Sequence, residues 1–302
     1  MTPMNLRGVF APIPTPFDRD EQVDLVRLGA ACARWAASPL AGLVVLGSTG
    51  EAVLLDEVES DRVVAFTRER WPPGKSRPFI VGAGRESTSA TIRAVRRAAD
   101  LGADAVLVRT PGFYKSQMTN DAFVRHYTAV ADASPVPVLL YNFTAVTGVN
   151  LSPVAVSRLA THPNIAGIKE SSGDIAQMTD LVAGTPDDFR VLAGSSTTFY
   201  SALCVGATGG VLALACVLPD ACVRLFELTS DGHHVEAAVL QHRLVPVAKL
   251  VGTMHGVPGL KAALQLAGCD VGIARAPLAP VSEGTVAALR EALVSFEEVA
   301  LV

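Results

Sequence analysis

The chain has 302 residues, a formal net charge of −4 and an isoelectric point near 5.9, and half of its residues are hydrophobic. It contains no run of lysines and arginines that would follow a phosphate backbone, which argues against nucleic acid as a partner. It also lacks a charged and apolar leader and any apolar stretch near the roughly 20 residues that cross a bilayer, so we expect a cytoplasmic protein without a membrane partner.

Eight short apolar runs rich in β-branched residues predict β-strands. The runs begin at Gly8, Gly42, Phe79, Ala105, Val136, Ile165, Arg190 and Gly209. The segments between them have the 3.6-residue periodicity of helices, and one such helix is predicted to begin at the N-cap Ser87 and to close at Gly102. Strands that alternate with helices predict parallel βαβ units. Eight units favour a closed (β/α)8 TIM barrel over the alternative, an open doubly wound sheet.

The strand pattern ends before residue 218, and further helices are predicted near residues 235–251, 260–268 and 282–298. We therefore expect residues 1–217 to form the barrel, with the active site at the carboxyl ends of the strands. Residues 218–302 are expected to supply a barrel-completing helix and a C-terminal helical extension that forms one structural unit with the barrel. The cysteines are spread widely without a CxxC pair and are predicted to be reduced core residues: Cys32, Cys204, Cys216, Cys222 and Cys269.

Lys169 closes the sixth predicted strand and is the residue that most suggests catalysis. A buried ammonium is unfavourable unless it is paired or gives up its proton, and a neutral amine is a nucleophile. The chain has five lysines and twenty arginines, and arginine cannot form an imine, so a lysine at this point suggests chemistry rather than charge. The alternative is a structural lysine that reaches the rim or pairs with Glu170 or another carboxylate.

Two other strand ends carry reactive groups. The turn after the second strand places Ser48 and Thr49 between glycines, where hydroxyls and backbone N–H groups can bind a carboxylate or phosphate, or merely cap the next helix. Tyr141 closes the fifth strand and is either a proton-transfer group or a core residue with its hydroxyl bonded to backbone. An amine, a phenol and a carboxylate cradle on strand ends of one barrel are the parts of a Schiff-base lyase.

Three ordered motifs strengthen this interpretation: GSTGE at residues 47–51, YN at 141–142 and GIKES at 167–171. With them the chain resembles, over nearly its whole length, the dihydrodipicolinate synthase and N-acetylneuraminate lyase family of class I aldolases. The resemblance implies a TIM barrel with a C-terminal helical extension, usually assembled as a homotetramer (a dimer of dimers). It also implies a lysine that condenses with the ketone of pyruvate or a related 2-oxo acid, with no metal or cofactor.

The resemblance also implies roles for individual residues. Lys169 would form the imine, Tyr141 would move protons, and Ser48 and Thr49 would hold the substrate carboxylate, with Thr49 relaying protons to Tyr141. Ser171 would face the rest of the substrate. The backbone from Gly209 to Val211 would close the pocket from the eighth strand.

Departures from the family pattern bear on the substrate. Family synthases typically have an arginine where this chain has Val146, and neuraminate lyases typically carry acidic side chains where it has Ser195 and Ser196. The overall look is closest to the 4-hydroxy-2-oxoglutarate aldolase branch, which releases pyruvate and glyoxylate. Dihydrodipicolinate synthase activity, or another 2-oxo-acid aldolase or dehydratase activity, remains the alternative.

Two further departures concern loops. A tyrosine that reaches into the neighbouring subunit in many family members corresponds to Phe113, with Tyr114 next to it, and Thr144 replaces a usual proline. Two rival classes therefore stay open. One is a 2-oxo-acid-binding barrel without catalysis, and the other is a phosphate-binding barrel that would use Gly194 and Gly209–Gly210.

Overall fold

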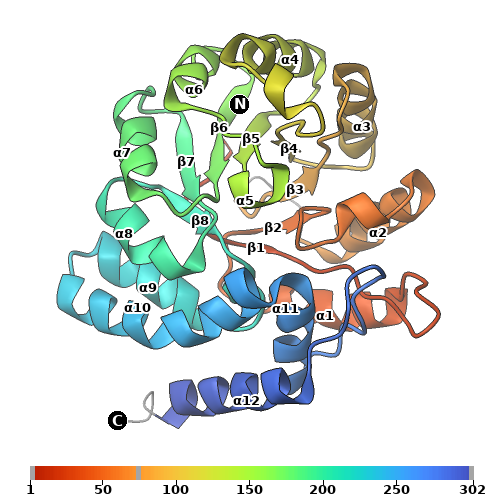
Figure 1. Cartoon of the computed structure of the whole chain (residues 1–302), viewed down its shortest axis with the longest axis vertical. Coiled ribbons are helices and arrows are strands. Elements are labelled where there is room, and N and C mark those ends of the chain that lie inside the picture. The colour runs from red at the N-terminus through yellow and green to blue at the C-terminus, as the bar shows by residue number, and fades with distance from the viewer. Residues whose placement is uncertain (1–3, 73–75, 299–302) are drawn as a thin grey trace.

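The strands form a closed barrel in which neighbours along the chain pair in parallel and the eighth strand pairs with the first (Figure 1). The computed structural model describes residues 4–72 and 76–298; the parts of the predicted barrel and extension at residues 1–3, 73–75 and 299–302 lie outside the described residues. The predicted TIM barrel is confirmed, and the doubly wound alternative is wrong. The strands are β1 Gly8–Pro12, β2 Gly42–Val45, β3 Phe79–Gly82, β4 Ala105–Arg109, β5 Val138–Asn142, β6 Ile165–Glu170, β7 Arg190–Ala193 and β8 Gly209–Val211.

Helices surround the barrel. They are α1 Leu25–Ala36, α2 Glu57–Arg70, α3 Thr88–Asp100, α4 Asn120–Ala133, α5 Thr144–Thr147, α6 Pro153–Leu159, α7 Ile175–Ala183, α8 Phe199–Cys204, α9 Pro219–Ser230, α10 His234–Lys249, α11 Gly256–Leu266 and α12 Glu283–Glu298. The predicted cap is confirmed, because the Ser87 hydroxyl accepts a hydrogen bond from the backbone N–H of Ala90 at the start of α3. Gly102 follows the end of that helix with a positive φ of 90°, which favours glycine.

Side chains alternate along each strand between the barrel interior and the layer under the helices. On β5, Leu139 and Tyr141 belong to the interior cluster, whereas Val138 and Leu140 pack in the outer core. The same alternation on β6 places Ile168 in the outer core. Lys169, which is in register with Tyr141, therefore points to the interior. The alternation of side chains along β5 and β6 therefore places the Lys169 amine and the Tyr141 phenol together in the barrel interior.

The C-terminal extension follows the last strand. Helix α9 packs against α8 and β1, α10 packs on α9, and α12 lies against α10 and α11; Figure 1 shows α10 to α12 in blue along one side of the barrel. A π-helical turn, Leu250–Met254, joins α10 to α11. The division of the chain at residue 217 stays a prediction.

Two properties of the described residues complete the fold. None of the helices in residues 4–72 and 76–298 has the length and apolar character that crossing a membrane requires. Four cysteines are buried as predicted, but Cys204 is exposed at the end of α8, so its prediction as a core residue is wrong. The apolar context of Cys204 comes from neighbours on the inner side of this short helix, such as the buried Ala202.

Candidate active site at the carboxyl ends of the strands

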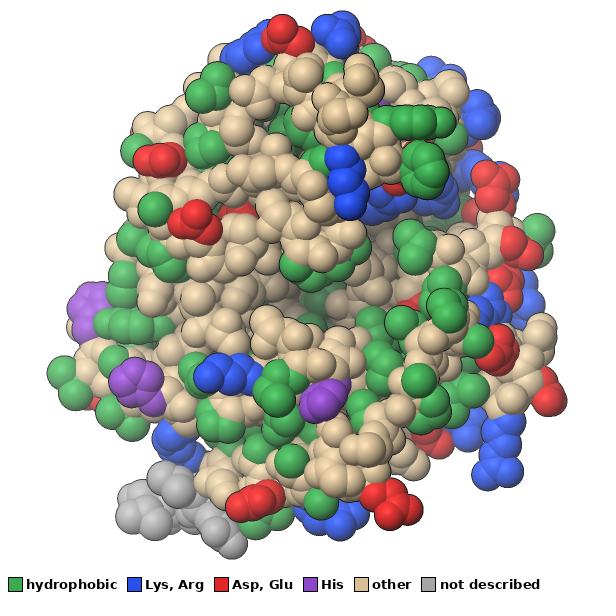
Figure 2. Space-filling model, viewed as in Figure 1, with side chains coloured by type: hydrophobic (Ala, Val, Ile, Leu, Met, Phe, Trp, Pro, Cys, Tyr) green, Lys and Arg blue, Asp and Glu red, His purple; other side chains and the backbone are tan. Residues whose placement is uncertain are grey.

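Lys169 and Tyr141 lie side by side at the ends of β6 and β5, and each is only 4% exposed. The Lys169 Nζ atom lies 4.4 Å from the centroid of the Tyr141 ring. The face of a phenol ring attracts a cation, and so it compensates in part for the lost hydration of an ammonium. The space-filling view shows a hollow near the middle of the face that carries these strand ends (Figure 2). The structure therefore brings the predicted nucleophile and the predicted proton-transfer group together.

The turn after β2 brings a hydroxyl to Tyr141. The Ser48 Oγ atom lies 3.3 Å from the Tyr141 hydroxyl oxygen, within hydrogen-bonding distance. The resemblance implies that Thr49 relays protons to Tyr141; the structure places the Ser48 hydroxyl at this distance from the phenol, and the relay by Thr49 stays a prediction. The turn has positive φ angles at Leu46 (54°) and Glu51 (55°), a conformation that non-glycine residues rarely adopt. The strand alternation therefore breaks at Leu46, whose side chain packs in the outer core although Val44 belongs to the interior cluster.

Glu170 does not pair with Lys169. It points to the opposite side of the strand, where Oε2 accepts hydrogen bonds from Asn142 Nδ2 (2.8 Å) and Gln177 Nε2 (2.9 Å), and Oε1 accepts one from the backbone N–H of Ser172 (2.6 Å). Asn142 in turn accepts from the backbone N–H of Leu151 at 2.9 Å. The alternative of a structural Lys169–Glu170 pair is therefore wrong, and the carboxylate instead fixes the strand ends behind the amine and the phenol.

Ser171 lies between the ends of β6 and β7. Its Oγ atom is buried and has no hydrogen-bond partner among the described residues. A β-carbon at Gly194 would overlap this hydroxyl, so glycine is required for the close approach of the two loops. A buried hydroxyl without a partner costs free energy that a bound polar ligand can recover. This makes Ser171 a candidate contact for substrate.

The residues predicted on the eighth strand take different places. Val211 packs in the interior cluster that includes Tyr141. Gly209 opens β8 in register with Gly8 and with Leu192, the residue that is itself in register with Lys169. A β-carbon at Gly209 would overlap the backbone of Gly8, so this glycine serves strand packing. Its predicted role in closing the pocket stays a prediction, and a packed strand glycine argues against the phosphate-binding alternative.

The loop after β4 presents two aromatic rings to solvent. Phe113 is 76% exposed and Tyr114 is 70% exposed, and their rings meet edge to face with centroids 5.1 Å apart. Glu86 accepts hydrogen bonds from the backbone N–H groups of Gly112 (2.9 Å) and Phe113 (3.0 Å) and pairs with Arg109 (2.6 Å). Burial acts to raise the pKa of Glu86, but these bonds outweigh it and lower the pKa. A fixed carboxylate therefore holds the loop in place.

Residues that flank the mouth of the barrel carry no charge where the family pattern has one. Val146 lies on α5 and is 61% exposed. Thr144 is the first residue of that short helix, a position that tolerates the absence of proline. Ser195 shares a hydrogen bond with Thr197 (3.0 Å) at the end of β7. The side chains at these three positions are therefore uncharged, and a cation close to α5 is Lys115, whose Nζ atom lies beside the C-cap of that helix.

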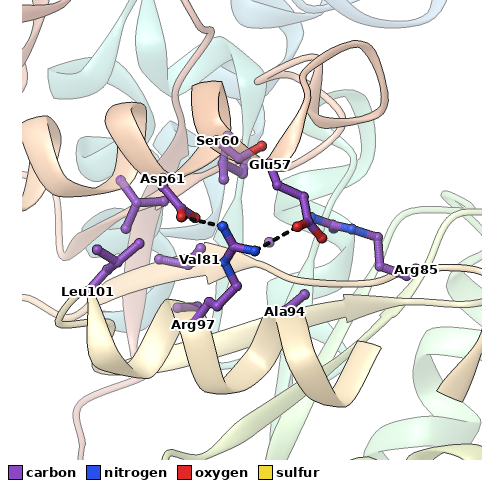
Figure 3. Close-up of a pocket in the computed structure, with 12 residues that line it drawn as sticks. Glu57, Ser60, Asp61, Val81, Arg85, Ala94, Arg97 and Leu101 are labelled. Atoms are coloured by element: carbon purple, nitrogen blue, oxygen red, sulfur yellow. Dashed lines mark hydrogen bonds and ion pairs between the residues drawn. The ribbon is translucent and has the colours of Figure 1, made fainter. Parts of the chain in front are cut away.

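A second pocket lies between α2 and α3, where Leu46 and Gly82 at the ends of β2 and β3 also line it (Figure 3). Arg97 crosses it and pairs with Glu57 (2.6 Å) and Asp61 (2.5 Å). Its cavity volume is about 20 Å³, which is room for a single water molecule. The pocket is therefore a gap beside the ion pairs that join α2 and α3, and it is too small for a metabolite.

The sequence analysis did not predict the structural roles of three acidic residues. Glu86 holds the β4 loop, Glu170 holds the strand ends, and Glu51 is buried against Lys261 of α11. Glu170 carried a local signal, because it follows Lys169 directly and therefore had to point to the other face of the strand. The partners of Glu51 and Glu86 come from other parts of the fold and gave no sequence signal.

Comparison with known proteins is consistent with this geometry. Residues 5–295 match the model of the "Dihydrodipicolinate synthetase family". A 4-hydroxy-tetrahydrodipicolinate synthase of Exiguobacterium sp. is 37% identical over 97% of this chain and 98% of its own length. A probable mitochondrial 4-hydroxy-2-oxoglutarate aldolase of Emericella nidulans is 39% identical over 94% of this chain and 93% of its own.

Solved structures agree with the relatives. The crystal structure of a dihydrodipicolinate synthase from Thermotoga maritima superposes with a TM-score of 0.91, at 33% identity over 96% of this chain and 98% of that chain. A likeness of this degree covers the barrel and the helices after it. Both enzyme names among the relatives correspond to the two activities that the sequence left open.

Proposed function

Because the chain belongs to the dihydrodipicolinate synthetase family, we propose that it is a Schiff-base-forming lyase of that family and that Lys169 is the amine that forms the imine with a pyruvate-derived 2-oxo acid. The observation that supports this most directly is the buried Lys169 Nζ against the Tyr141 ring, with the hydroxyl of Ser48 beside the phenol. A nucleophile, a proton carrier and a second hydroxyl then occupy one shielded space.

The reaction begins with the neutral Lys169 amine adding to C2 of the 2-oxo acid. Proton transfer to the C2 oxygen lets water leave, and the product is a protonated imine, which draws electrons from the neighbouring carbon. In aldol cleavage the C4 hydroxyl loses its proton and the C3–C4 bond breaks. The electron pair of that bond forms an enamine, and an aldehyde is released. Protonation of C3 followed by hydrolysis then frees pyruvate and restores the amine.

Tyr141 is the group proposed to carry protons in these steps, with Ser48 as its neighbour. General acid–base catalysis by a positioned side chain contributes roughly 10²- to 10⁴-fold. Ser48 and Thr49, at the turn after β2, are proposed to hold the substrate carboxylate. The unpartnered hydroxyl of Ser171 is proposed to meet the part of the substrate that becomes the aldehyde.

We propose 4-hydroxy-2-oxoglutarate as the substrate, cleaved to pyruvate and glyoxylate. Support comes from the 39% identity to the probable aldolase of E. nidulans and from the neutral Val146 at the position implied to be arginine in family synthases. The neutral Ser195 and Ser196 argue against a long polyol substrate. The second candidate is 4-hydroxy-tetrahydrodipicolinate synthase, which condenses pyruvate with aspartate semialdehyde; it is favoured by the 37% identity to the Exiguobacterium enzyme over 98% of that protein.

Reductive trapping tests the proposed imine. Incubation with pyruvate and borohydride should add one reduced pyruvate per chain, and peptide mass spectrometry should place it on Lys169. Lys169→Arg should remain unlabelled because a guanidinium cannot form the imine. Tyr141→Phe is the matched control, since it keeps the lysine and should still be labelled, only more slowly. An unlabelled wild type, or label spread over the other lysines, would exclude this mechanism.

A substrate panel then separates the two candidate activities. The panel compares pyruvate release from 4-hydroxy-2-oxoglutarate and from N-acetylneuraminate with the condensation of pyruvate and aspartate semialdehyde. We expect the first reaction to have the highest kcat/KM. Efficient condensation would overturn the inference from Val146 and favour the synthase.

We also propose that the protein assembles as a homotetramer. Support comes from the exposed pair Phe113 and Tyr114, which a held loop projects from the surface beside the barrel mouth. Large exposed aromatic groups in a fixed loop are typical of interfaces. Light scattering coupled to size exclusion should give four times the chain mass, and a monomer at micromolar concentration would contradict the proposal.

A further inference from the structure

Lys261 is a buried cation far from Lys169 in the sequence. It lies on α11 of the C-terminal extension and is 3% exposed. Its Nζ atom donates hydrogen bonds to the backbone oxygens of Thr15 (2.7 Å) and Ile273 (2.6 Å) and lies 2.6 Å from Glu51 Oε1. Burial lowers the pKa of Lys261, and Glu51 opposes this shift. One amine therefore ties together the loop after β1, the extension and the turn after β2.

Glu51 is the partner of Lys261 and ends the GSTGE turn. It is almost fully buried, with its backbone held at a φ of 55°. Oε2 accepts a hydrogen bond from the backbone N–H of Arg275 (2.8 Å). Oε1 accepts no well-aligned hydrogen bond among the described residues, so the close Lys261 ammonium balances its charge through the ionic contact itself. A carboxylate without that ammonium would be left buried and uncompensated.

The same turn is held through its backbone. The Thr15 hydroxyl donates a hydrogen bond to the carbonyl oxygen of Gly50 at 2.7 Å, and Lys261 holds the carbonyl oxygen of Thr15 itself. Ser48 begins the other side of this turn, and its backbone oxygen accepts from the N–H of Glu51 at 3.1 Å. The position of the Ser48 hydroxyl against Tyr141 is thus connected to Lys261 through two short chains of contacts.

Stability alone does not account for this arrangement. The desolvation of two buried charges offsets most of their attraction, and well-packed apolar side chains of similar size are often as stable or more so. A compact ammonium can, however, donate hydrogen bonds to two converging carbonyl oxygens and at the same time lie against a carboxylate. A buried pair of this kind is suited to fixing a loop in one position.

We propose that Lys261 and Glu51 are positioning residues for the reaction, through which the C-terminal extension holds the GSTGE turn so that Ser48 stays against Tyr141. The inference rests on the proposed function, in which Tyr141 carries protons and Ser48 lies beside it. Neither Lys261 nor Glu51 touches the substrate in this proposal. The extension, in contrast to the loops at the barrel mouth, then contributes to catalysis by bracing one turn.

The test uses Lys261→Met and the double variant Lys261→Met with Glu51→Gln. The single variant should have a lower Tm because it leaves a buried carboxylate unpaired. The double variant removes the charge and should recover most of the Tm, but the turn remains untethered. Since a misplacement of about 1 Å can cost about 100-fold in rate, we expect kcat to fall by roughly this factor in both variants. Pyruvate should still be trapped on Lys169, and KM for the 2-oxo acid should change less than kcat.

Arg68→Met is the matched control. It breaks a part-buried ion pair with Asp104 (3.2 Å) that lies beside the amino end of β4, away from the strand ends that carry the site. This variant should lower Tm and leave kcat unchanged. A double variant with recovered Tm and wild-type kcat would overturn the positioning role.

Hydrogen exchange supplies a readout that does not depend on the chemistry. Peptides covering residues 47–51 should exchange faster in the double variant than in the wild type, while Arg68→Met should leave them unchanged. Unchanged exchange of this turn would also overturn the inference. If the wild type is not labelled by pyruvate and borohydride, the proposed function fails, and the exchange measurement still decides whether Lys261 braces the turn.

Discussion

Replacing Glu170 by glutamine is expected to destabilise the protein although the two side chains have nearly the same shape. The carboxylate is almost fully buried and accepts three hydrogen bonds. All three partners are donors: Asn142 Nδ2, Gln177 Nε2 and the backbone N–H of Ser172. A carboxylate can accept all of them, whereas an amide offers one acceptor oxygen and one NH₂ group that only donates.

The magnitude follows from this count. In the better orientation the amide oxygen of the Glu170→Gln variant faces Asn142 and Gln177, and its NH₂ group faces the Ser172 N–H, which is left without an acceptor. A buried donor without a partner costs about 1–3 kcal/mol, and the bonds that remain lose the strengthening that a charge gives them. We therefore expect the free energy of unfolding to fall by about 2–4 kcal/mol.

Urea unfolding at neutral pH measures this difference. Glu69→Gln is the control, because Glu69 is exposed and contacts only Arg70 at 3.2 Å among its salt-bridge partners in the described residues; its change should stay within about 0.5 kcal/mol. Glu170 directly follows Lys169, and its partner Asn142 directly follows Tyr141. The Glu170→Gln variant should therefore have a lower kcat as well as a lower free energy of unfolding. A loss below about 0.5 kcal/mol for Glu170→Gln would refute the view that the three donors depend on this carboxylate.

Two further predictions concern the substrate and pH. Val146→Arg adds a cation at an exposed position, and one charge-assisted hydrogen bond should lower KM for aspartate semialdehyde about tenfold; a parallel change in KM for pyruvate would contradict a local effect. Burial lowers the pKa of His126 from 6.5 to about 4, with Glu86 opposing the shift. Between pH 7 and 5 the unfolded chain therefore takes up a proton at this histidine that the folded protein does not, so the wild type should lose about 2 kcal/mol more unfolding free energy on acidification than His126→Phe. Equal losses in urea titrations would exclude the shift.

The barrel and the closeness of Lys169 to Tyr141 were predictable because both depend on local patterns and on the topology. Apolar runs predict the eight strands. Ser87 caps the start of α3 because its hydroxyl can accept a hydrogen bond from a free backbone N–H group of the first turn. Lys169 and Tyr141 close successive strands of a parallel sheet, and such ends meet at one edge. Their closeness in space follows from the topology alone.

The conformation of the turn that carries Ser48 was not predictable in the same way. A regular strand would place alternate side chains on opposite faces, but the backbone takes positive φ angles at Leu46 and Glu51, and the alternation is lost there. Lys261 was unpredictable for another reason. Its partner Glu51 is 210 residues away in the chain, and only the packing of α11 on the barrel brings them together.

The strand ends are expected to determine the chemistry at this site, and the loops are expected to determine which substrate it accepts. On β5 and β6 the inward residues Tyr141 and Lys169 form the proposed reacting pair. The outward residues Asn142 and Glu170 bond to each other behind them. An exchange of either outward residue should therefore act on every substrate alike, because it would move the lysine that is proposed to form the imine. Val146 lies on a loop helix outside this frame, so its exchange should act on one substrate and leave imine formation with pyruvate unchanged. The proposed chemistry and the proposed substrate can thus fail independently, and trapping at Lys169 decides the first while the substrate panel decides the second.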